Sequence, residues 1–285
     1  MPLTSLVRLL ASETKPYTSP YTGSRAWAPA DLATPPLLQV VASSATMSGT
    51  TVTGVPNSGS LGGTFAAYDG TVTKGAQLNG QDTLSFDGAS SLQLASASHG
   101  AGARVLFAVF ALNQAHGALI GWQWDNSLGA LVWYANDNGF STWYNNSTGS
   151  DVCKVEFSGL DTNPHIVNLR ANNDAGSYGR LDGVAQSVGV TNNGTAPAAR
   201  SNVPVFLGQG GTTFGGEYLN GRVAYFAYLD YDIGLSDLQR LEGWAAWTYG
   251  LQSSLPAGHP YKAAAPTVAV AAIASRRRPL MLIAS

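Results

Sequence analysis

The most regular pattern of apolar and polar positions lies in residues 236–249, shortly before the C-terminal end of the chain. Apolar side chains recur there every three or four residues, which predicts a helix with one buried face. Ser236 is a favourable N-cap, and Gln239 three positions later completes a capping box. Gly250 supplies a left-handed stop. The apolar face of this helix consists of Leu238, Leu241, Trp244 or Ala245, and Tyr249.

The chain before this helix shows the pattern of a β-protein. Short runs rich in Val, Phe, Tyr and Thr fill residues 37–228 and are separated by Gly, Asn and Asp. The run 104–112, RVLFAVFAL, is almost continuously apolar. A strand of that composition is typically buried on both faces, so we expect it in the middle of the domain.

Turn signals between these runs indicate how the strands are connected. The runs 83–86 and 91–94 are joined by Asp87-Gly88, a dipeptide that predicts a hairpin. About a dozen strands with turns every eight to twelve residues are typical of a sandwich. We therefore predict an all-β fold, a two-sheet antiparallel jelly-roll sandwich with one C-terminal helix and extended N- and C-terminal arms.

The two ends of the chain differ from its central region. Residues 1–36 are rich in proline and tyrosine, which predicts an extended arm rather than a helix or a central strand. Residues 251–285 are predicted to form a C-terminal attachment tail, and residues 37–250 the jelly-roll domain. Neither end has the length and composition of a membrane span, and the first residues lack the basic leader of a secretory signal.

The composition limits the class of protein. Only 11% of the 285 residues are charged, and a net charge of -2 offers no field that would steer the chain onto nucleic acid. The 33 glycines fit a turn-rich secreted or virion β-protein. The single cysteine, Cys153, has no partner for an intrachain disulfide, so we interpret it as a small buried side chain.

The motifs of an enzyme are missing from the sequence. A glycosidase on such a fold needs two facing carboxylates, usually at alternate positions of one strand. Asp87, Asp137 and Asp182 lie instead in predicted turns, where we expect their side chains to cap backbone amides. The 4 histidines occur singly, without the spacing of a zinc site, and there is no Gly-x-Ser-x-Gly elbow. We therefore predict that the protein is not an enzyme and binds no metal at a catalytic site.

An aromatic cluster in residues 122–145 is the best candidate for recognition. Sugar rings stack on indoles, while their hydroxyls bond to the Asp and Asn side chains of nearby loops. Core packing is the alternative, and it is favoured for Trp122, Trp124 and Trp133, whereas the two interpretations are balanced for the residues that flank polar turns. The predicted carbohydrate-binding residues are Trp143, Tyr144, Asp125, Asn126, Asp137 and Asn138.

Four short motifs follow one another along residues 84–225. They are LSFDG and SSL at 84–92, NLR and GRLDGV at 168–184, VFLG at 205–208, and FGGEYLNGRVAY at 214–225. Their order resembles the laminin-G-like members of the concanavalin A-like lectin jelly rolls, over roughly residues 37–250. The ending of the domain resembles that of such domains in bacteriophage virion proteins.

The resemblance implies a curved-sheet sandwich that binds carbohydrate or another protein, and it implies no catalysis. Laminin-G-like domains often bind calcium through paired acidic residues, which have no clear match here. Calcium is therefore not supported, and no cofactor is expected.

The last residues of the chain combine arginines with apolar side chains. We predict that this segment docks in an acidic groove of a capsid or tail protein, with its apolar residues buried in the contact. The predicted docking residues are Arg276, Arg277, Arg278, Leu280 and Leu282.

These features together predict a non-enzymatic bacteriophage virion structural protein. It would be a capsid decoration, head-fibre or tail-associated subunit that displays a lectin-like domain for particle stabilisation or adhesion to host glycans. The expected location is the virion, and the expected partners are other virion proteins and further copies of the chain in a symmetric homo-oligomer. The alternative is a soluble or secreted carbohydrate-binding lectin module, and a third hypothesis is a polysaccharide-cleaving jelly-roll enzyme.

Overall fold

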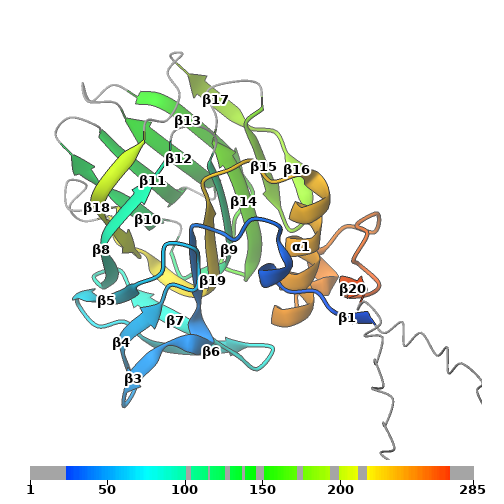
Figure 1. Ribbon diagram of the computed structural model, residues 1–285, viewed down its shortest axis with the longest axis horizontal. Coiled ribbons are helices and arrows are strands. Elements are labelled where there is room, and N and C mark those ends of the chain that lie inside the picture. Colours follow the sequence, from blue (N-terminus) through cyan, green and yellow to red (C-terminus); the bar gives the residue numbers. More distant parts are fainter. Residues whose placement is uncertain are drawn as a thin grey trace, which may run out of the picture. The chain divides into compact units, whose positions relative to one another are not determined.

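The computed structural model describes residues 24–100, 104–114, 116–125, 129–136, 139–145, 151–171, 176–192, 199–210 and 217–269 (Figure 1). The chain divides into two units, of which the smaller spans Met1–Ala26 and Thr267–Ser285 and the larger spans Trp27–Pro266. Of the smaller unit, residues 24–26 and 267–269 belong to the described part of the chain. In the smaller unit, β1 (Ser24–Ala26) pairs antiparallel with β20 (Thr267–Ala269).

One of the two layers of strands in the larger unit is named here the middle sheet. Its strand order is β16–β15–β14–β9–β19. On the edge of β19 that faces away from β9, β7 pairs with residues 220–223 and β2 with residues 225–228, and β6 pairs with β7. Its strands are β2 (Leu38–Val41), β6 (Thr73–Leu78), β7 (Gln81–Asp87), β9 (Arg104–Leu112), β14 (His165–Ala171), β15 (Tyr178–Leu181), β16 (Val184–Gln186) and β19 (Asn220–Leu229).

The second layer is named here the outer sheet, and its strand order is β3–β4–β5–β8–β18–β10–β11–β12–β13–β17. A single pairing, Thr51 with Thr73, links it to the middle sheet. Its strands are β3 (Thr46–Ser48), β4 (Thr51–Pro56), β5 (Thr64–Asp69), β8 (Ser91–His99), β10 (His116–Asp125), β11 (Gly129–Asn136), β12 (Gly139–Asn145), β13 (Asp151–Ser158), β17 (Gly189–Asn192) and β18 (Arg200–Leu207).

The predicted fold class is confirmed. The described strands pair antiparallel in two layers, and the described residues contain one α-helix, α1 (Leu235–Tyr249), near the C-terminal end. Three short 3-10 helices complete the larger unit, η1 (Pro29–Asp31), η2 (Ala42–Ser44) and η3 (Gln252–Ser254).

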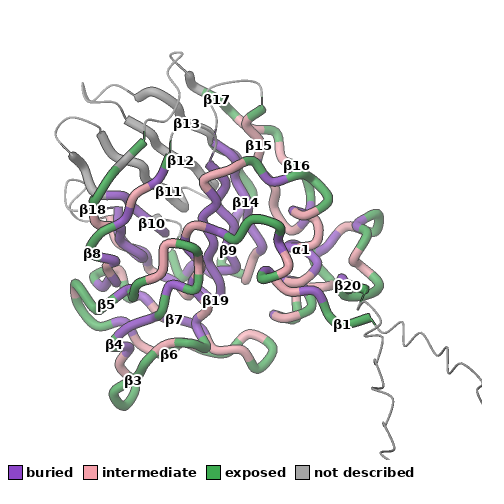
Figure 2. The backbone as a smooth tube through the Cα atoms, viewed as in Figure 1, coloured by how far each residue is buried: buried purple, intermediate pink, exposed green. Residues whose placement is uncertain are grey.

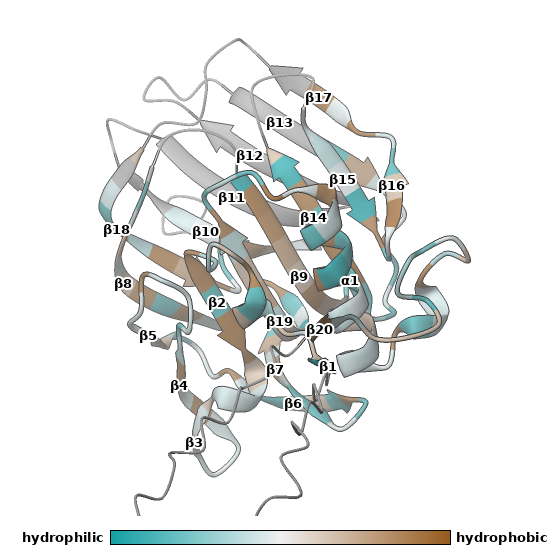
Figure 3. Ribbon diagram, turned by 45° about the vertical axis from the view of Figure 1, so that its right-hand side comes forward, coloured by the Kyte–Doolittle hydropathy of each residue, from teal (hydrophilic) through white to brown (hydrophobic). Residues whose placement is uncertain are grey.

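Strand β9 explains why helix α1 packs on the middle sheet as a third layer beside the two sheets. All 9 of its residues are buried, as its continuous apolar run predicted (Figures 2 and 3). Leu106, Ala108, Phe110 and Leu112 belong to the core cluster between the two sheets. The alternate residues face the other way because side chains alternate along a strand. There Phe107 contacts Tyr225 of β19, and Tyr225 contacts Trp244 of α1, with ring centroids 6.0 and 4.8 Å apart.

Helix α1 begins one residue earlier than predicted, and the predicted capping box is wrong. The N-cap is Gly234, whose carbonyl accepts hydrogen bonds from the amides of Asp237 and Leu238. Ile233 before the cap and Leu238 in the first turn are both buried, at the two positions of a hydrophobic staple. This apolar pair sets the start of the helix, so Ser236 lies inside the first turn.

The residues that follow α1 pack within the larger unit up to Pro266. Leu255 is buried, and the ammonium of Lys262 donates to the carbonyls of Gln252, Ser253 and Leu255 at 2.7–2.8 Å. Residues 27–36 and 251–266, which were predicted to belong to an arm and a tail, are thus part of the larger unit.

The turn at Asp87-Gly88 was predicted to close a hairpin, and this prediction is wrong. The Asp87 carboxylate caps the Ala89 amide at 3.0 Å, and Gly88 has φ +86°, as a turn requires. The flanking strands β7 and β8, both fully described, have no register with each other, since β7 pairs with β19 and β6, and β8 with β18 and β5. The turn therefore carries the chain from one sheet to the other.

Gly250 ends α1 as predicted, and its replacement offers a test. Its φ is +73°, its amide bonds to the Ala246 carbonyl, and an added Cβ would lie 3.0 Å from Cβ of Asn79. We expect Gly250→Ala to lower the free energy of unfolding by about 1–2 kcal/mol, measured by urea denaturation. Gly258→Ala is the matched control, because a Cβ there meets open space. Equal stability of the two variants would contradict this account of the helix end.

Candidate functional site

The predicted aromatic cluster lies on strands of the outer sheet. Trp122 is fully buried and packs edge-on against His99, with ring centroids 4.5 Å apart, so its interpretation as a core residue is confirmed. Asp125 ends β10, and Trp143 and Tyr144 lie in β12, but the side chains of these three lie outside the described residues. Also outside are Asn126, Asp137, Asn138, Arg276, Arg277, Arg278, Leu280 and Leu282. The carbohydrate and docking roles of all these residues stay predictions.

An exposed aromatic side chain is described at the end of β5. The Tyr68 ring is 44% exposed and packs edge-on against Phe206, with ring centroids 5.1 Å apart. Phe206 lies between Val205 and Leu207, which belong to the core between the sheets, so Phe206 faces the opposite side. Tyr68 therefore lies on the outward face of the outer sheet.

A β-bulge places Asp69 beside Tyr68. The register pairs Ala67 with Leu92 and Asp69 with Ser91, which leaves Tyr68 as the extra residue. A bulge interrupts the alternation of side chains, so two consecutive residues can serve the same face. The group formed by Tyr68, Asp69 and Tyr218 is named here the Tyr68 ledge.

A chain of hydrogen bonds holds the polar part of the ledge. The Tyr218 hydroxyl donates to Oδ2 of Asp69 at 2.9 Å, and the Gln209 amide donates to the Tyr218 oxygen at 3.1 Å. The Ser91 hydroxyl donates to Oε1 of Gln209 at 3.1 Å. Gln209 and Ser91 are buried, so hydrogen bonds from the protein interior fix the positions of Asp69 and Tyr218.

The backbone at Gln209 and at Tyr218 packs directly on β10. These two residues form a β-bridge, and the Gly210 amide donates to the Glu217 carbonyl at 3.1 Å. A Cβ on Gly121 of β10 would lie 2.4 Å from the carbonyl carbon of Gly210. Glycine at position 121 therefore lets the backbone of Gln209 and Gly210 pack closely on β10.

The ledge combines an apolar surface with a negative charge. Burial and the hydrogen bond to Asp69 raise the pKa of Tyr218, so its hydroxyl keeps the proton that it donates. The other carboxylate oxygen of Asp69 receives no hydrogen bond from the described residues, and the side chain is partly exposed. It can therefore accept a hydrogen bond from a ligand that lies on Tyr68.

A second polar cluster is buried between α1 and the middle sheet, around Glu242. Its carboxylate accepts bonds from Arg180 at 2.6 and 3.0 Å and from Asn168 at 2.9 Å, and contacts the His259 ring at 3.0 Å. Burial alone would raise the pKa of Glu242, but the bonds from His259, Arg180 and Asn168 outweigh it and hold the pKa below its usual range. The cluster joins α1, β14, β15 and the segment after the helix.

A third polar group surrounds His165 at the start of β14. Its two ring nitrogens contact Asp182 at 2.7 Å and Asp161 at 2.9 Å. Burial lowers the pKa of His165, but the two carboxylates outweigh it and raise the pKa above its usual value. Asp182 also accepts the amide of Ile166 at 2.8 Å, so it joins β14 to the next turn and does not cap its own turn as predicted.

Two further features, a metal site and a membrane-spanning helix, are absent from the described residues. These residues contain no group of three or more His, Cys, Asp or Glu side chains that could hold a metal ion. They also contain no helix long and apolar enough to span a bilayer.

Comparison with known proteins shows a shared fold. Neither a family model nor a curated protein matches the chain. Among solved structures, the binding domain of botulinum neurotoxin serotype D/C matches with a TM-score of 0.52 and 11% identity, over 73% of this chain and 51% of that chain. A mutant of HCR D/C matches with a TM-score of 0.51 and 10% identity, over 73% and 51%.

A carbohydrate-binding structure is found at greater distance. It is the CBM40 of the Ruminococcus gnavus IT-sialidase bound to α2,3-sialyllactose, with a TM-score of 0.38 and 10% identity, over 52% of this chain and 96% of that chain. The chain spans about half the length of the botulinum structures that it matches. At these identities the likeness to the botulinum domains shows the β-sandwich fold alone.

The ledge was not predicted from the sequence, although its residues carry a signal. Tyr68-Asp69-Gly70 places an aromatic ring, a carboxylate and a left-handed glycine, φ +55°, at the end of a strand. Tyr218 lies in one of the motifs on which the lectin resemblance was based, but no role was assigned to it. The bulge that brings these side chains to one face depends on the partner strand.

The buried carboxylate offers a test of stability. We expect Glu242→Gln to lower the free energy of unfolding by about 3 kcal/mol at pH 7, because Arg180 and His259 lose their charged partner. Glu156→Gln, at an exposed position, is the control. Since the folded pKa of Glu242 lies below its ordinary value of 4.5, the stability it adds is present above that pH. That stability is lost as the pH falls through the folded pKa.

The measurement is urea denaturation of both variants and the parent at pH 7 and through the acid range. The difference between the parent and Glu242→Gln should shrink as the pH falls below about 4.5. A difference that is independent of pH would show that the charge of Glu242 adds nothing to the stability.

Proposed function

We propose that the chain is a carbohydrate-binding module that recognises a sugar at the Tyr68 ledge and has no catalytic activity. The observation that carries this proposal is an exposed tyrosine ring held on Phe206 beside the partly exposed carboxylate of Asp69. We expect the sugar to be neutral or weakly charged.

The chemistry of a sugar matches the ledge in two respects. One face of a pyranose ring is made of C–H groups, which pack on an aromatic ring, and the hydroxyls at its edge need acceptors. Tyr68 offers the ring and Asp69 the acceptor. Both side chains are already held by protein contacts, so little side-chain freedom is lost when a sugar binds.

The fold is compatible with sugar binding but is not evidence for it. The chain shares its fold with a botulinum neurotoxin binding domain, and one fold can host many unrelated functions. The support therefore comes from the ledge. The predicted residues Trp143 and Asp125 belong to strands of the same outer sheet, and we include them in the proposal as an extension of the site.

The absence of catalysis is proposed on the hydrogen bonding of Asp69. A glycosidase needs one carboxylic acid that gives up a proton and a second carboxylate across the substrate. Asp69 accepts a hydrogen bond from the Tyr218 hydroxyl at 2.9 Å and so serves the ledge as an acceptor. An acceptor suits the binding of a sugar hydroxyl, whereas the acid of a glycosidase must donate a proton.

We further propose that the module belongs to a phage virion as a decoration, head-fibre or tail-associated subunit. Besides the resemblance in sequence, one observation favours display on a particle. β1 and β20 pair antiparallel, so segments from the two ends of the chain run together as one ribbon in the smaller unit. A ribbon of this kind suits attachment at a single point. A secreted lectin would use the same ledge without a particle.

The sugar site is tested by removing the Tyr68 ring. A glycan array identifies the sugar, and calorimetry then compares variants. We expect Tyr68→Ala to weaken binding by about tenfold or more, because the stacking surface is lost, while Tyr68→Phe keeps most of it. Trp247→Ala is the control, since Trp247 is exposed to 36% on α1, away from the ledge.

Two outcomes would contradict the proposal. Equal affinity of Tyr68→Ala and the parent would place the sugar elsewhere. Hydrolysis of an array glycan by the parent, lost in Asp69→Asn, would make the protein an enzyme.

The virion role is tested by deleting residues 270–285, which removes the predicted docking residues and keeps β20. We expect the shortened chain to keep its melting temperature but to be at least about tenfold depleted from purified particles, as measured by immunoblot. Replacement of Arg276, Arg277 and Arg278 by lysine is the control that keeps the charge. Unchanged incorporation of the shortened chain would contradict docking by this segment.

A further inference from the structure

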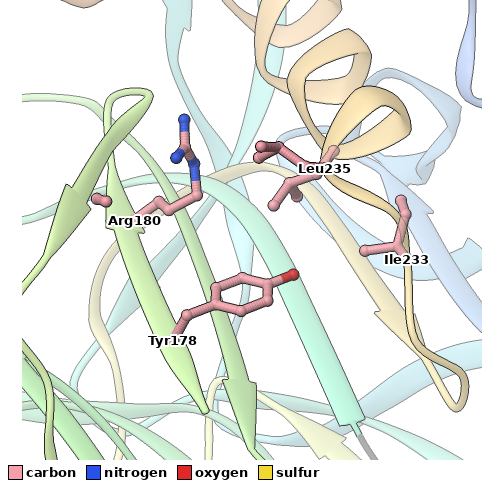
Figure 4. A pocket seen from close by; sticks show the side chains of 6 residues that line it. Tyr178, Arg180, Ile233 and Leu235 are labelled. Carbon is pink, nitrogen blue, oxygen red and sulfur yellow. The ribbon is translucent and has the colours of Figure 1, made fainter. Parts of the chain in front are cut away.

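A cavity of about 280 Å³ lies between β15, β16 and the first turn of α1 (Figure 4). It is on the helix side of the middle sheet, whereas the Tyr68 ledge is on the outward face of the outer sheet. Its wall is mostly apolar, so it is a different kind of site. The lining residues are Tyr178, Arg180, Ala185, Ile233, Leu235 and Leu238.

The Tyr178 hydroxyl is the polar atom that the cavity offers to a ligand. It is buried and has no hydrogen-bond partner among the described residues. Figure 4 shows it pointing away from β15 toward the side where Ile233 and Leu235 lie. A buried hydroxyl without a partner costs free energy, so a ligand that accepts its proton gains from the contact.

The second polar side chain of the wall is already engaged. The Arg180 guanidinium donates to both oxygens of Glu242 and to the Gly183 carbonyl. Its charge is therefore neutralised within the protein. In Figure 4 the guanidinium points away from the Tyr178 hydroxyl. The cavity thus offers no unpaired cation to an anionic ligand.

The size and the rim of the cavity limit the ligand further. A dry apolar cavity of about 150 Å³ holds benzene, so about 280 Å³ accommodates a ring that carries a substituent. Leu235, exposed to 58%, belongs to the lining and gives the cavity an apolar rim that a small uncharged molecule can cross.

We propose that this cavity binds a small uncharged molecule with a mostly apolar one-ring body and one oxygen acceptor, to which Tyr178 donates a hydrogen bond. Burial and the nearby Asp232 carboxylate raise the pKa of Tyr178, so the hydroxyl remains a donor at neutral pH. The site does not depend on the sugar-binding ledge.

The proposal is tested with two fluorinated probes observed by fluorine NMR on the full chain. 4-Fluoroacetophenone has a ring and a carbonyl acceptor, and 4-fluorotoluene has the ring alone. We expect saturable binding of both probes, with the ketone bound about three to ten times more tightly, as one hydrogen bond allows. Absence of saturable binding would overturn the proposal.

Variants separate the contributions of the hydroxyl and of the cavity. Tyr178→Phe should bind the ketone only as tightly as the toluene. Ala185→Trp, at an exposed position, should fill the cavity and weaken both probes by at least about tenfold. Tyr231→Phe removes a hydroxyl that bonds to the Thr34 carbonyl outside the cavity, and should bind as the parent does.

Two results would contradict the assignment. A ketone preference that survives Tyr178→Phe would exclude the hydrogen bond, and parent-like binding by Ala185→Trp would place the probes elsewhere. Should Ala185→Trp fail to fold, NOEs from the bound ketone to the Tyr178 ring decide the question on the parent protein. Their absence under saturating ketone would overturn the proposal.

Discussion

The middle sheet is covered on both faces, and most other features of the molecule depend on this constraint. Strand β9 is buried along its whole length, so each of its faces needs an apolar partner. The outer sheet covers one face, and α1 packs on the other through Trp244 and Tyr225. A polar side chain buried on the helix side gains free energy from a partner inside the protein. Glu242 is this partner for Arg180, Asn168 and His259 together.

The outward face of the outer sheet is under a weaker constraint, and the candidate sugar site lies there. Solvent can satisfy polar groups on this face, so side chains are free to serve a ligand. The ledge uses two departures from regular strand structure, a bulge at Tyr68 and the close packing of Gly210 on Gly121. The regular strands supply the base, with Phe206 supporting the exposed ring.

Features set by neighbouring residues could be predicted from the sequence, whereas those set by distant ones could not. The burial of β9 and the stop at Gly250 follow from local composition and backbone conformation. The start of α1 was misplaced because the buried pair Ile233 and Leu238 outweighs a capping side chain. A turn dipeptide does not reveal that its two strands join different sheets. The ledge was missed because a bulge is defined by register with another strand.

The first and last residues of the larger unit are in contact, because the amide of Trp27 donates to the carbonyl of Pro266 at 2.9 Å. A unit with adjoining ends is portable, because it can be spliced into a surface loop of an unrelated host without stretching either partner.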